Sequence, residues 1–256
     1  MSRPRPHPAK VLAVVGFGIF VAADDLTVAS TLLRQIVGDL RIPLPERFDD
    51  AAWIVNGYLV AYVAVMPIAG RLSDVLGRRR VFIGGLALFA IGSAVIPFTT
   101  SLGPFLTWRV VTAIGGGAMV PVALAAVTDV YPRERRGRAL GALGAIETLG
   151  WVWGPLFGAM LVRFLDWRWQ FYLNVPLAML GIAAAWVVLR DVGDPVPSRR
   201  LDAAGAIALS SALVALTIGL LEVGDIASAA DLAGLGSDGD LPAWPFFVAA
   251  VVATIA

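Results

Sequence analysis

Seven long apolar stretches constrain this chain more than any other feature of its sequence. A bilayer core about 30 Å thick is crossed by a helix of about 20 mostly apolar residues, and each stretch has roughly that length. The stretches lack the alternation of polar and apolar residues that marks the strands of a membrane barrel. We therefore predict an all-α, polytopic membrane protein. The predicted spans are 11–33, 51–72, 81–100, 104–127, 139–163, 171–189 and 203–223.

Composition supports this class and excludes several others. Apolar residues make up 58% of the 256 residues and charged residues 15%, whereas a soluble chain is typically about 45–50% apolar and about 25% charged. The chain holds no Cys, and its one histidine, His7, lies in a Pro-rich start. Disulfides, thiolate sites, a histidine metal cluster and a Ser-His-Asp triad are therefore excluded within this chain. The formal net charge of +1 gives no indication of nucleic-acid binding.

An eighth apolar stretch, from Trp244 to Ala256, is too short to cross a bilayer. The sequence therefore predicts the N-terminal portion of a longer protein. The first stretch has an alternative interpretation as a signal peptide, since Val21-Ala22-Ala23 resembles a cleavage site. Six further spans favour the interpretation as a membrane helix.

The distribution of basic residues predicts how the chain is oriented. Loops on the cytoplasmic side of a membrane carry an excess of Lys and Arg. With the N-terminus in the cytoplasm, that side receives the tail, the run at 71–80, the cluster at 133–138 and the arginines at 190–200. We therefore predict a multi-pass protein of the cell membrane with a cytoplasmic N-terminus. The opposite side receives Arg34, Arg41, Arg47, Arg163 and Arg168.

The loop between the second and third spans carries the most specific motif. It runs from Gly70 to Arg80, as Gly-Arg-Leu-Ser-Asp-Val-Leu-Gly-Arg-Arg-Arg. It resembles the signature loop of the major facilitator superfamily, Gly-x-Leu-(Ala/Ser)-Asp-x-x-Gly-Arg-(Lys/Arg), at every defining position. The resemblance implies that Asp129, at the end of the fourth span, pairs with an arginine of this loop as a conformational latch. The loop residues of this motif are Gly70, Asp74, Gly77, Arg78 and Arg79.

The fifth span resembles the antiporter motif of the same family, Gly-x-x-x-Gly-Pro-x-x-Gly-Gly. Gly150, Gly154, Pro155 and Gly158 match it, and Ala159 replaces the final glycine. Small residues four apart leave a smooth groove on one helix face, and a proline bends the helix. The motif implies export, and plain helix packing is the alternative interpretation.

Further stretches are similar to this family and to its drug:proton antiporters. Residues 109–117 in the fourth span resemble the family's Arg-x-x-Gln-Gly-x-Gly pattern, and residues 25–30 and the connector 166–176 resemble the drug:proton antiporter branch, with some positions departing from the pattern. Residues 200–205, followed by another apolar span without a long cytoplasmic loop, resemble the fourteen-span antiporters of that branch. The resemblance implies a major facilitator fold, with an N-terminal six-helix bundle, the first additional helix and a partial eighth span. The implied division is a cytoplasmic tail at 1–10, the bundle at 11–190, a linker at 191–202 and additional helices at 203–256.

Ionisable residues inside spans are costly and usually functional. Asp25 and Arg109 are expected roughly 12 Å and 8 Å below the same outer end of the membrane, so they can pair. Such a pair is either a proton-coupling element or a static structural contact. Glu147 lies two helical turns before Gly154 on the same face, where it suits proton exchange, cation binding or hydrogen-bonded packing. Asp24 is expected to face the outer interface.

Four aromatic residues are candidates for a substrate cavity that binds apolar cations. The alternative is that they pack or face lipid. They are Tyr58, Trp151, Trp153 and Phe157.

We therefore predict a transporter, not an enzyme, that exports drug-like or amphiphilic small molecules in exchange for protons by alternating access. The proton gradient supplies the energy, and no cofactor or metal is expected. The predicted partners are a small-molecule substrate, protons and the lipid bilayer, with no nucleic acid. The alternatives are an exporter of a metabolite such as an amino acid, sugar or siderophore, and a non-transporting fragment or assembly partner.

Overall fold

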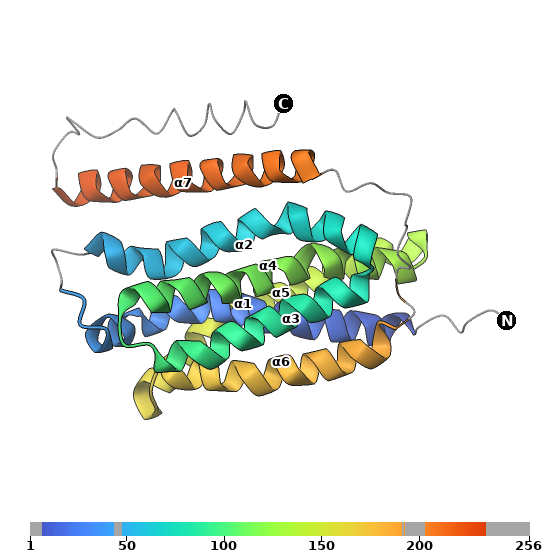
Figure 1. Ribbon diagram of the computed structural model, residues 1–256, viewed down its shortest axis with the longest axis horizontal. Coiled ribbons are helices and arrows are strands. Elements are labelled where there is room, and N and C mark those ends of the chain that lie inside the picture. The colour runs from blue at the N-terminus through green and yellow to red at the C-terminus, as the bar shows by residue number, and fades with distance from the viewer. Residues whose placement is uncertain (1–6, 44–47, 191, 193–202, 234–256) are drawn as a thin grey trace. The chain divides into compact units, whose positions relative to one another are not determined.

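The computed structural model describes residues 7–43, 48–190, 192 and 203–233. These parts of the chain are helical and contain no strand, which confirms the all-α prediction (Figure 1). The predicted eighth stretch, Trp244–Ala256, lies outside the described residues. The helices are α1 (Pro8–Asp39), α2 (Phe48–Leu76), α3 (Arg78–Val95), the short 3-10 helix η1 (Ile96–Phe98), α4 (Leu102–Val130), α5 (Arg133–Phe164), α6 (Arg168–Val188) and α7 (Ala203–Ala233).

The span predicted at 81–100 runs from α3 through η1 to the two residues after it, and each of the other six predicted spans corresponds to one α-helix. The described residues form seven helices that are long and apolar enough to cross a membrane. Most of the helices extend beyond the predicted limits. The span predicted at 11–33 continues to Asp39, and the span predicted at 139–163 begins at Arg133. Hydropathy marks only the part of a helix that suits the hydrocarbon core, whereas the helical hydrogen bonds continue into the polar interface.

The chain forms two compact units, residues 1–201 and residues 202–256. In the first unit α4 packs against α1, α2 and α3 (Figure 1). Helix α5 packs along α1, and α6 contacts α1 and α3. The largest fully buried apolar side chains include Ile19, Phe82 and Phe89. The described part of the second unit is α7, whose stretch Ala204–Leu221 is strongly apolar.

A run of three glycines lets two helices approach α4 closely. A Cβ atom on Gly115 would lie 2.5 Å from the carbonyl oxygen of Gly85 on α3, and one on Gly117 would meet the backbone of Tyr62 on α2. These contacts are with backbone atoms, which cannot move aside as a flexible side chain can. Small residues at such positions are typical of helix contacts inside membranes.

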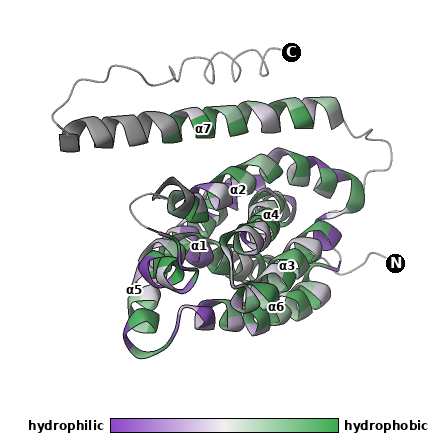
Figure 2. Cartoon of the chain, turned by 60° about the vertical axis from the view of Figure 1, so that its left-hand side comes forward, coloured by the Kyte–Doolittle hydropathy of each residue, from purple (hydrophilic) through white to green (hydrophobic). Residues whose placement is uncertain are grey.

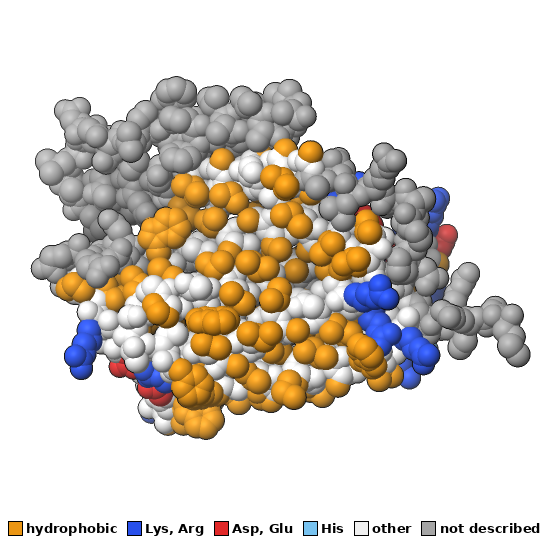
Figure 3. All heavy atoms as spheres, in the orientation of Figure 1, with side chains coloured by type: hydrophobic (Ala, Val, Ile, Leu, Met, Phe, Trp, Pro, Cys, Tyr) orange, Lys and Arg blue, Asp and Glu red, His pale blue; other side chains and the backbone are white. Residues whose placement is uncertain are grey.

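The outer faces of α5 and α6 are also apolar. Leu149, Val152 and Met179 are each about 60% exposed in the chain alone. Figure 2 shows hydrophobic residues around most of the helix surface, and Figure 3 shows lysine and arginine side chains gathered at the ends of the visible face. A surface of this kind requires an apolar surrounding, lipid or another part of a membrane protein.

Candidate functional site

Two adjacent carboxyl side chains are buried near the middle of α1. Asp24 is 7% exposed and Asp25 is fully buried. Asp25 lies 14 residues before Asp39, the last residue of α1, which is about 21 Å along the helix. The prediction that Asp24 faces the outer interface was wrong, because its side chain is buried and accepts a hydrogen bond from Gln170 of α6.

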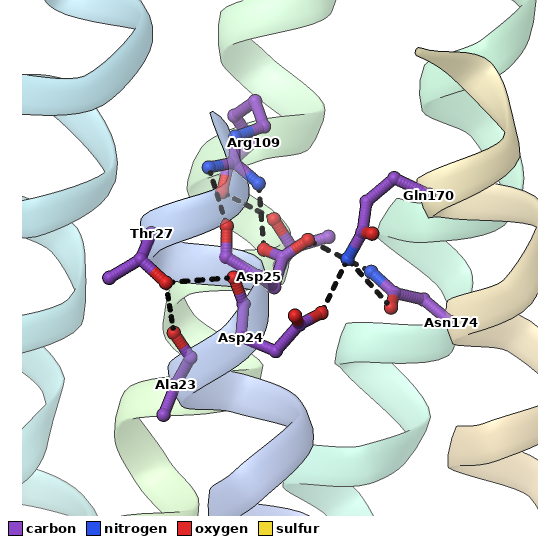
Figure 4. Close-up of polar contacts among 8 residues, drawn as sticks. Ala23, Asp24, Asp25, Thr27, Arg109, Gln170 and Asn174 are labelled. Atoms are coloured by element: carbon purple, nitrogen blue, oxygen red, sulfur yellow. Dashed lines mark hydrogen bonds and ion pairs between the residues drawn. The ribbon is translucent and has the colours of Figure 1, made fainter. Parts of the chain in front are cut away.

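Arg109 of α4 pairs with Asp25, as predicted. Its Nη1 donates to Asp25 Oδ2 at 2.7 Å, and its Nη2 donates to the Asp25 carbonyl oxygen at 3.4 Å (Figure 4). The guanidinium carbon lies 4.3 Å from the centre of the Tyr58 ring. Arg109 is 1% exposed, so a cation, an anion and an aromatic ring share a site that is closed to the surroundings.

Two amide side chains of α6 complete the cluster. Asn174 donates from Nδ2 to Asp25 Oδ1 at 2.8 Å, and Gln170 donates from Nε2 to Asp24 Oδ2 at 2.8 Å (Figure 4). Both amides are 1% exposed. Sequence reasoning missed them, although their spacing of four residues places them on one helix face. The contacts come from α1, α4 and α6, which ties three helices together at one level.

The glycines of the antiporter motif pack α5 against α1 at this same level. A Cβ atom on Gly150 would lie 2.7 Å from the carbonyl oxygen of Phe20, and one on Gly154 would lie 2.9 Å from the carbonyl oxygen of Asp24. Gly158 lies farther along the same groove, against Val28 and Thr31. Pro155 lies inside α5 directly after Gly154. The smooth groove expected from small residues four apart is therefore present, and it faces the helix that carries the carboxylates.

Glu147 also lies near the middle of its helix, 14 residues after Arg133. Its side chain is intermediate in exposure. It does not join the hydrogen-bonded cluster of Asp25 and Arg109 that the described residues form. The structure therefore places this candidate one helical turn before Gly150 on α5, separate from the buried ion pair.

A cavity of about 380 Å³ lies between α2 and α4 and reaches the ion pair. Tyr58 and Arg109 are among its lining residues, so the structure brings one of the four predicted aromatic residues to it. Trp151 and Trp153 are instead exposed on α5, and Phe157 stacks on Trp153 with ring centres 6.3 Å apart. The remaining lining residues are Trp53, Gly57, Val60, Ala61, Leu106 and Val110.

The signature loop makes a tight turn and a set of ion pairs. Gly77 has a φ of 91°, a backbone conformation that favours glycine. Arg78 pairs with Asp74 and also donates from Nε to Asp129 Oδ2 at 3.1 Å. The predicted pairing of Asp129 with an arginine of this loop is therefore confirmed.

Two further residues of this loop contact neighbouring helices. The guanidinium of Arg79 lies 4.0 Å from the centre of the Trp186 ring on α6. Gly70 lies next to Pro121 of α4, at an ordinary van der Waals distance. The loop thus links the ends of α2 and α3 to both α4 and α6.

The connector before α6 forms the corresponding contacts at the opposite end of the bundle. Arg168 donates from Nη1 to Asp39 Oδ2 at 2.6 Å and from Nε to the carbonyl oxygen of Pro97 at 3.1 Å. Trp167 donates from Nε1 to the same Asp39 oxygen at 2.9 Å. These bonds hold the end of α1 beside the start of α6, and so fix the level at which the amides of α6 meet the carboxylates of α1.

Comparisons with known proteins agree with this architecture. The chain is 38% identical over 205 residues to multidrug resistance protein 3 of Bacillus subtilis, covering 79% of this chain and 38% of that protein. It is 35% identical over 208 residues to the probable triacylglyceride transporter ML0556 of Mycobacterium leprae, covering 79% of this chain and 40% of that protein. The chain thus spans about two fifths of the length of these relatives.

Solved structures show the same fold. The proton:xylose symporter XylE superposes on 90% of this chain and 56% of its own, with a TM-score of 0.62 and 16% identity. The family model of the major facilitator superfamily matches residues 15–256. The chain therefore belongs to the major facilitator superfamily, a family of transporters rather than enzymes.

Proposed function

We propose that the protein to which this chain belongs exports drug-like or amphiphilic small molecules in exchange for protons. The observation that carries this proposal is the buried Asp25–Arg109 pair, whose side chains meet at 2.7 Å and whose arginine lines a cavity. Ionisable groups inside the membrane are costly and mark ion pathways and proton relays. A proton that neutralises a carboxylate here changes the charge balance of the pair, and so changes how tightly α1 and α4 are held together. No cofactor is needed, because the proton gradient drives the exchange.

The lining of the cavity supports an apolar or amphiphilic substrate. Apart from Tyr58 and Arg109, its side chains are hydrocarbon or indole groups, as in Val60, Leu106 and Trp53. A sugar or amino acid would lose its hydrogen bonds to water on entering such a site without gaining replacements. The names of the two relatives, a multidrug resistance protein and a probable triacylglyceride transporter, agree with lipophilic cargo.

The signature loop has a separate role in this proposal. Alternating access requires two bundles to move against each other around a site near the middle of the membrane. The Arg78 pairs with Asp74 and Asp129 act as a latch at one end of the bundle, which we assign to the cytoplasmic side of the cell membrane. The glycines of α5 keep α1 and α5 in close contact during the movement.

Transport by the complete protein in proteoliposomes tests the proposal. An imposed pH gradient should drive movement of a lipophilic cation or a neutral lipid, and a panel that includes a sugar and an amino acid should separate this function from metabolite export. Asp25→Asn and Glu147→Gln each remove one candidate carboxyl, and Glu134→Gln on the exposed first turn of α5 is the control. Unchanged coupling in both Asp25→Asn and Glu147→Gln would remove these residues from the proton pathway.

A further inference from the structure

The buried cluster contains a carboxyl that the ion pair does not use. Asp25 has partners on both oxygens, Arg109 on Oδ2 and Asn174 on Oδ1. Asp24 has one partner, since Gln170 donates to Oδ2 while Oδ1 has no hydrogen-bond partner within the described part of the chain. The Oε1 atom of Gln170 is also without a partner there. Two neighbouring buried carboxyls are therefore held in different ways.

The charges that surround Asp24 do not balance a second carboxylate. From α1 it faces Asp25, and the buried arginine that the described residues bring to the cluster, Arg109 of α4, is already paired with Asp25. The polar groups contributed by α6 are neutral amides. The nearest acidic side chain on α5 is Glu147, which adds no positive charge, and Tyr58 of α2 is a phenol. An ionised Asp24 would leave the cluster with an excess negative charge inside a site closed to water, which is costly.

The neutral acid fits the hydrogen-bond groups that are present. A protonated carboxyl has one O–H donor and retains an acceptor oxygen. The Gln170 side chain offers a donor, which Asp24 Oδ2 already accepts, and an acceptor, Oε1, which is unused. The Gln170 amide can therefore donate to the acceptor oxygen of a neutral Asp24 and accept from its O–H group. An ionised Asp24 has no O–H group, so the amide oxygen of Gln170 would have no donor from it.

We infer that Asp24 is a proton-binding carboxyl of this transporter, held in its neutral form by Gln170 while Asp25 remains paired with Arg109. The inference deepens the proposed function and rests on it for the role in transport. The proton comes from water on one side of the membrane and leaves to water on the other, and no covalent bond other than O–H changes. Loss of the proton places a second carboxylate next to Asp25, where it competes for the same guanidinium and loosens the contact between α1 and α4.

Infrared difference spectroscopy of the complete protein in lipid tests this assignment directly. Raising the pH should remove a C=O stretching band of a neutral carboxyl, and the band should be absent in Asp24→Asn and retained in Asp25→Asn, Glu147→Gln and the control Glu134→Gln. Gln170→Leu should shift the frequency of the band, because the carboxyl loses its hydrogen-bond partner. Asp24→Glu should restore a band, which keeps the test usable if Asp24→Asn folds poorly. A band that survives in Asp24→Asn, or that is lost in Glu147→Gln instead, would overturn the assignment.

Transport measurements separate this inference from the function on which it rests. With Asp24→Asn, transport driven by a pH gradient should fall to the level without a gradient, while substrate-driven exchange at equal pH continues. If the wild-type protein shows no gradient-driven transport but Asp24→Asn still removes the infrared band, the proposed antiport fails and the proton site stands. If the wild-type protein couples protons and Asp24→Asn couples them equally well, the inference about Asp24 fails alone.

Discussion

Replacing Arg109 by methionine should destabilise the bundle strongly, because it leaves a buried carboxylate without its cation. Arg109 is 1% exposed and Asp25 is fully buried, and their side chains meet at 2.7 Å. Breaking a buried pair by removing one partner typically costs about 3–5 kcal/mol. Asn174 would still donate to Asp25, and a neutral amide compensates only part of a full charge. We therefore expect a loss of about 3–5 kcal/mol in the free energy of unfolding.

The double variant Asp25→Asn with Arg109→Met provides the decisive comparison. The loss in a single variant comes from an uncompensated buried charge. The double variant has no charge at either position, so it should recover most of the loss. The assay is reversible unfolding in mixed micelles with increasing dodecyl sulfate, followed by tryptophan fluorescence. Arg163→Met, an exposed arginine of α5, is the control, and its effect should stay within about 0.5 kcal/mol. A double variant whose loss equals the sum of the two single losses would refute the reasoning, since it would show no coupling between the side chains.

Three other substitutions test the helix contacts and the loop. Gly154→Ala should lower the free energy of unfolding by about 1–3 kcal/mol, because its methyl group would meet backbone atoms of α1 within 3.0 Å. Its control is Gly144→Ala on the same helix, where a Cβ atom meets nothing within 4 Å, and this variant should leave thermal stability unchanged or slightly higher. Gly77→Ala should cost about 1–3 kcal/mol, because its φ of 91° and ψ of 146° form a backbone conformation that alanine rarely adopts. Thermal unfolding of Gly84→Ala, in open space on α3, is its control. Arg78→Gln should change stability by less than about 1 kcal/mol but slow transport in proteoliposomes, and an unchanged turnover rate would contradict the latch role.

The parts of the site that could be predicted from sequence are those with a strong local signal. Charged side chains within an apolar stretch are rare, so Asp25 and Arg109 were identified because they are charged. The helical rise, counted from the same face of the membrane, placed the two residues at depths similar enough to pair. The groove of α5 was predictable because glycines four apart must share one face of a helix. The seven helices were also predictable, because the length and hydropathy of each stretch are local properties of the sequence.

The site residues that were missed lie near the end of a helix or carry uncharged amide side chains. The sixth span was predicted to begin at residue 171, which left Gln170 just outside it, whereas α6 begins at Arg168 and includes the buried Gln170 in its first turn. Asp24 was misplaced because its partner, Gln170, lies on another helix, α6, and the sequence of α1 alone does not show that contact. Amide side chains also carry no charge to mark them inside a span, and their role appears only when a carboxylate from another helix lies opposite.

Residues from several stretches that resemble separate family motifs contact one short stretch of α1. The side chains of Asp24 and Asp25 bond to α6 and α4, while the backbone of Asp24 and Val28 contacts Gly154 of α5. A side chain added at Gly154 would therefore push on the same turn that presents the carboxylates. It follows that helix packing and proton binding cannot be altered independently here. We expect Gly154→Ala to shift the infrared band assigned to Asp24 as well as lower stability, and an unshifted band in a destabilised Gly154→Ala protein would show that the groove and the carboxyl act separately.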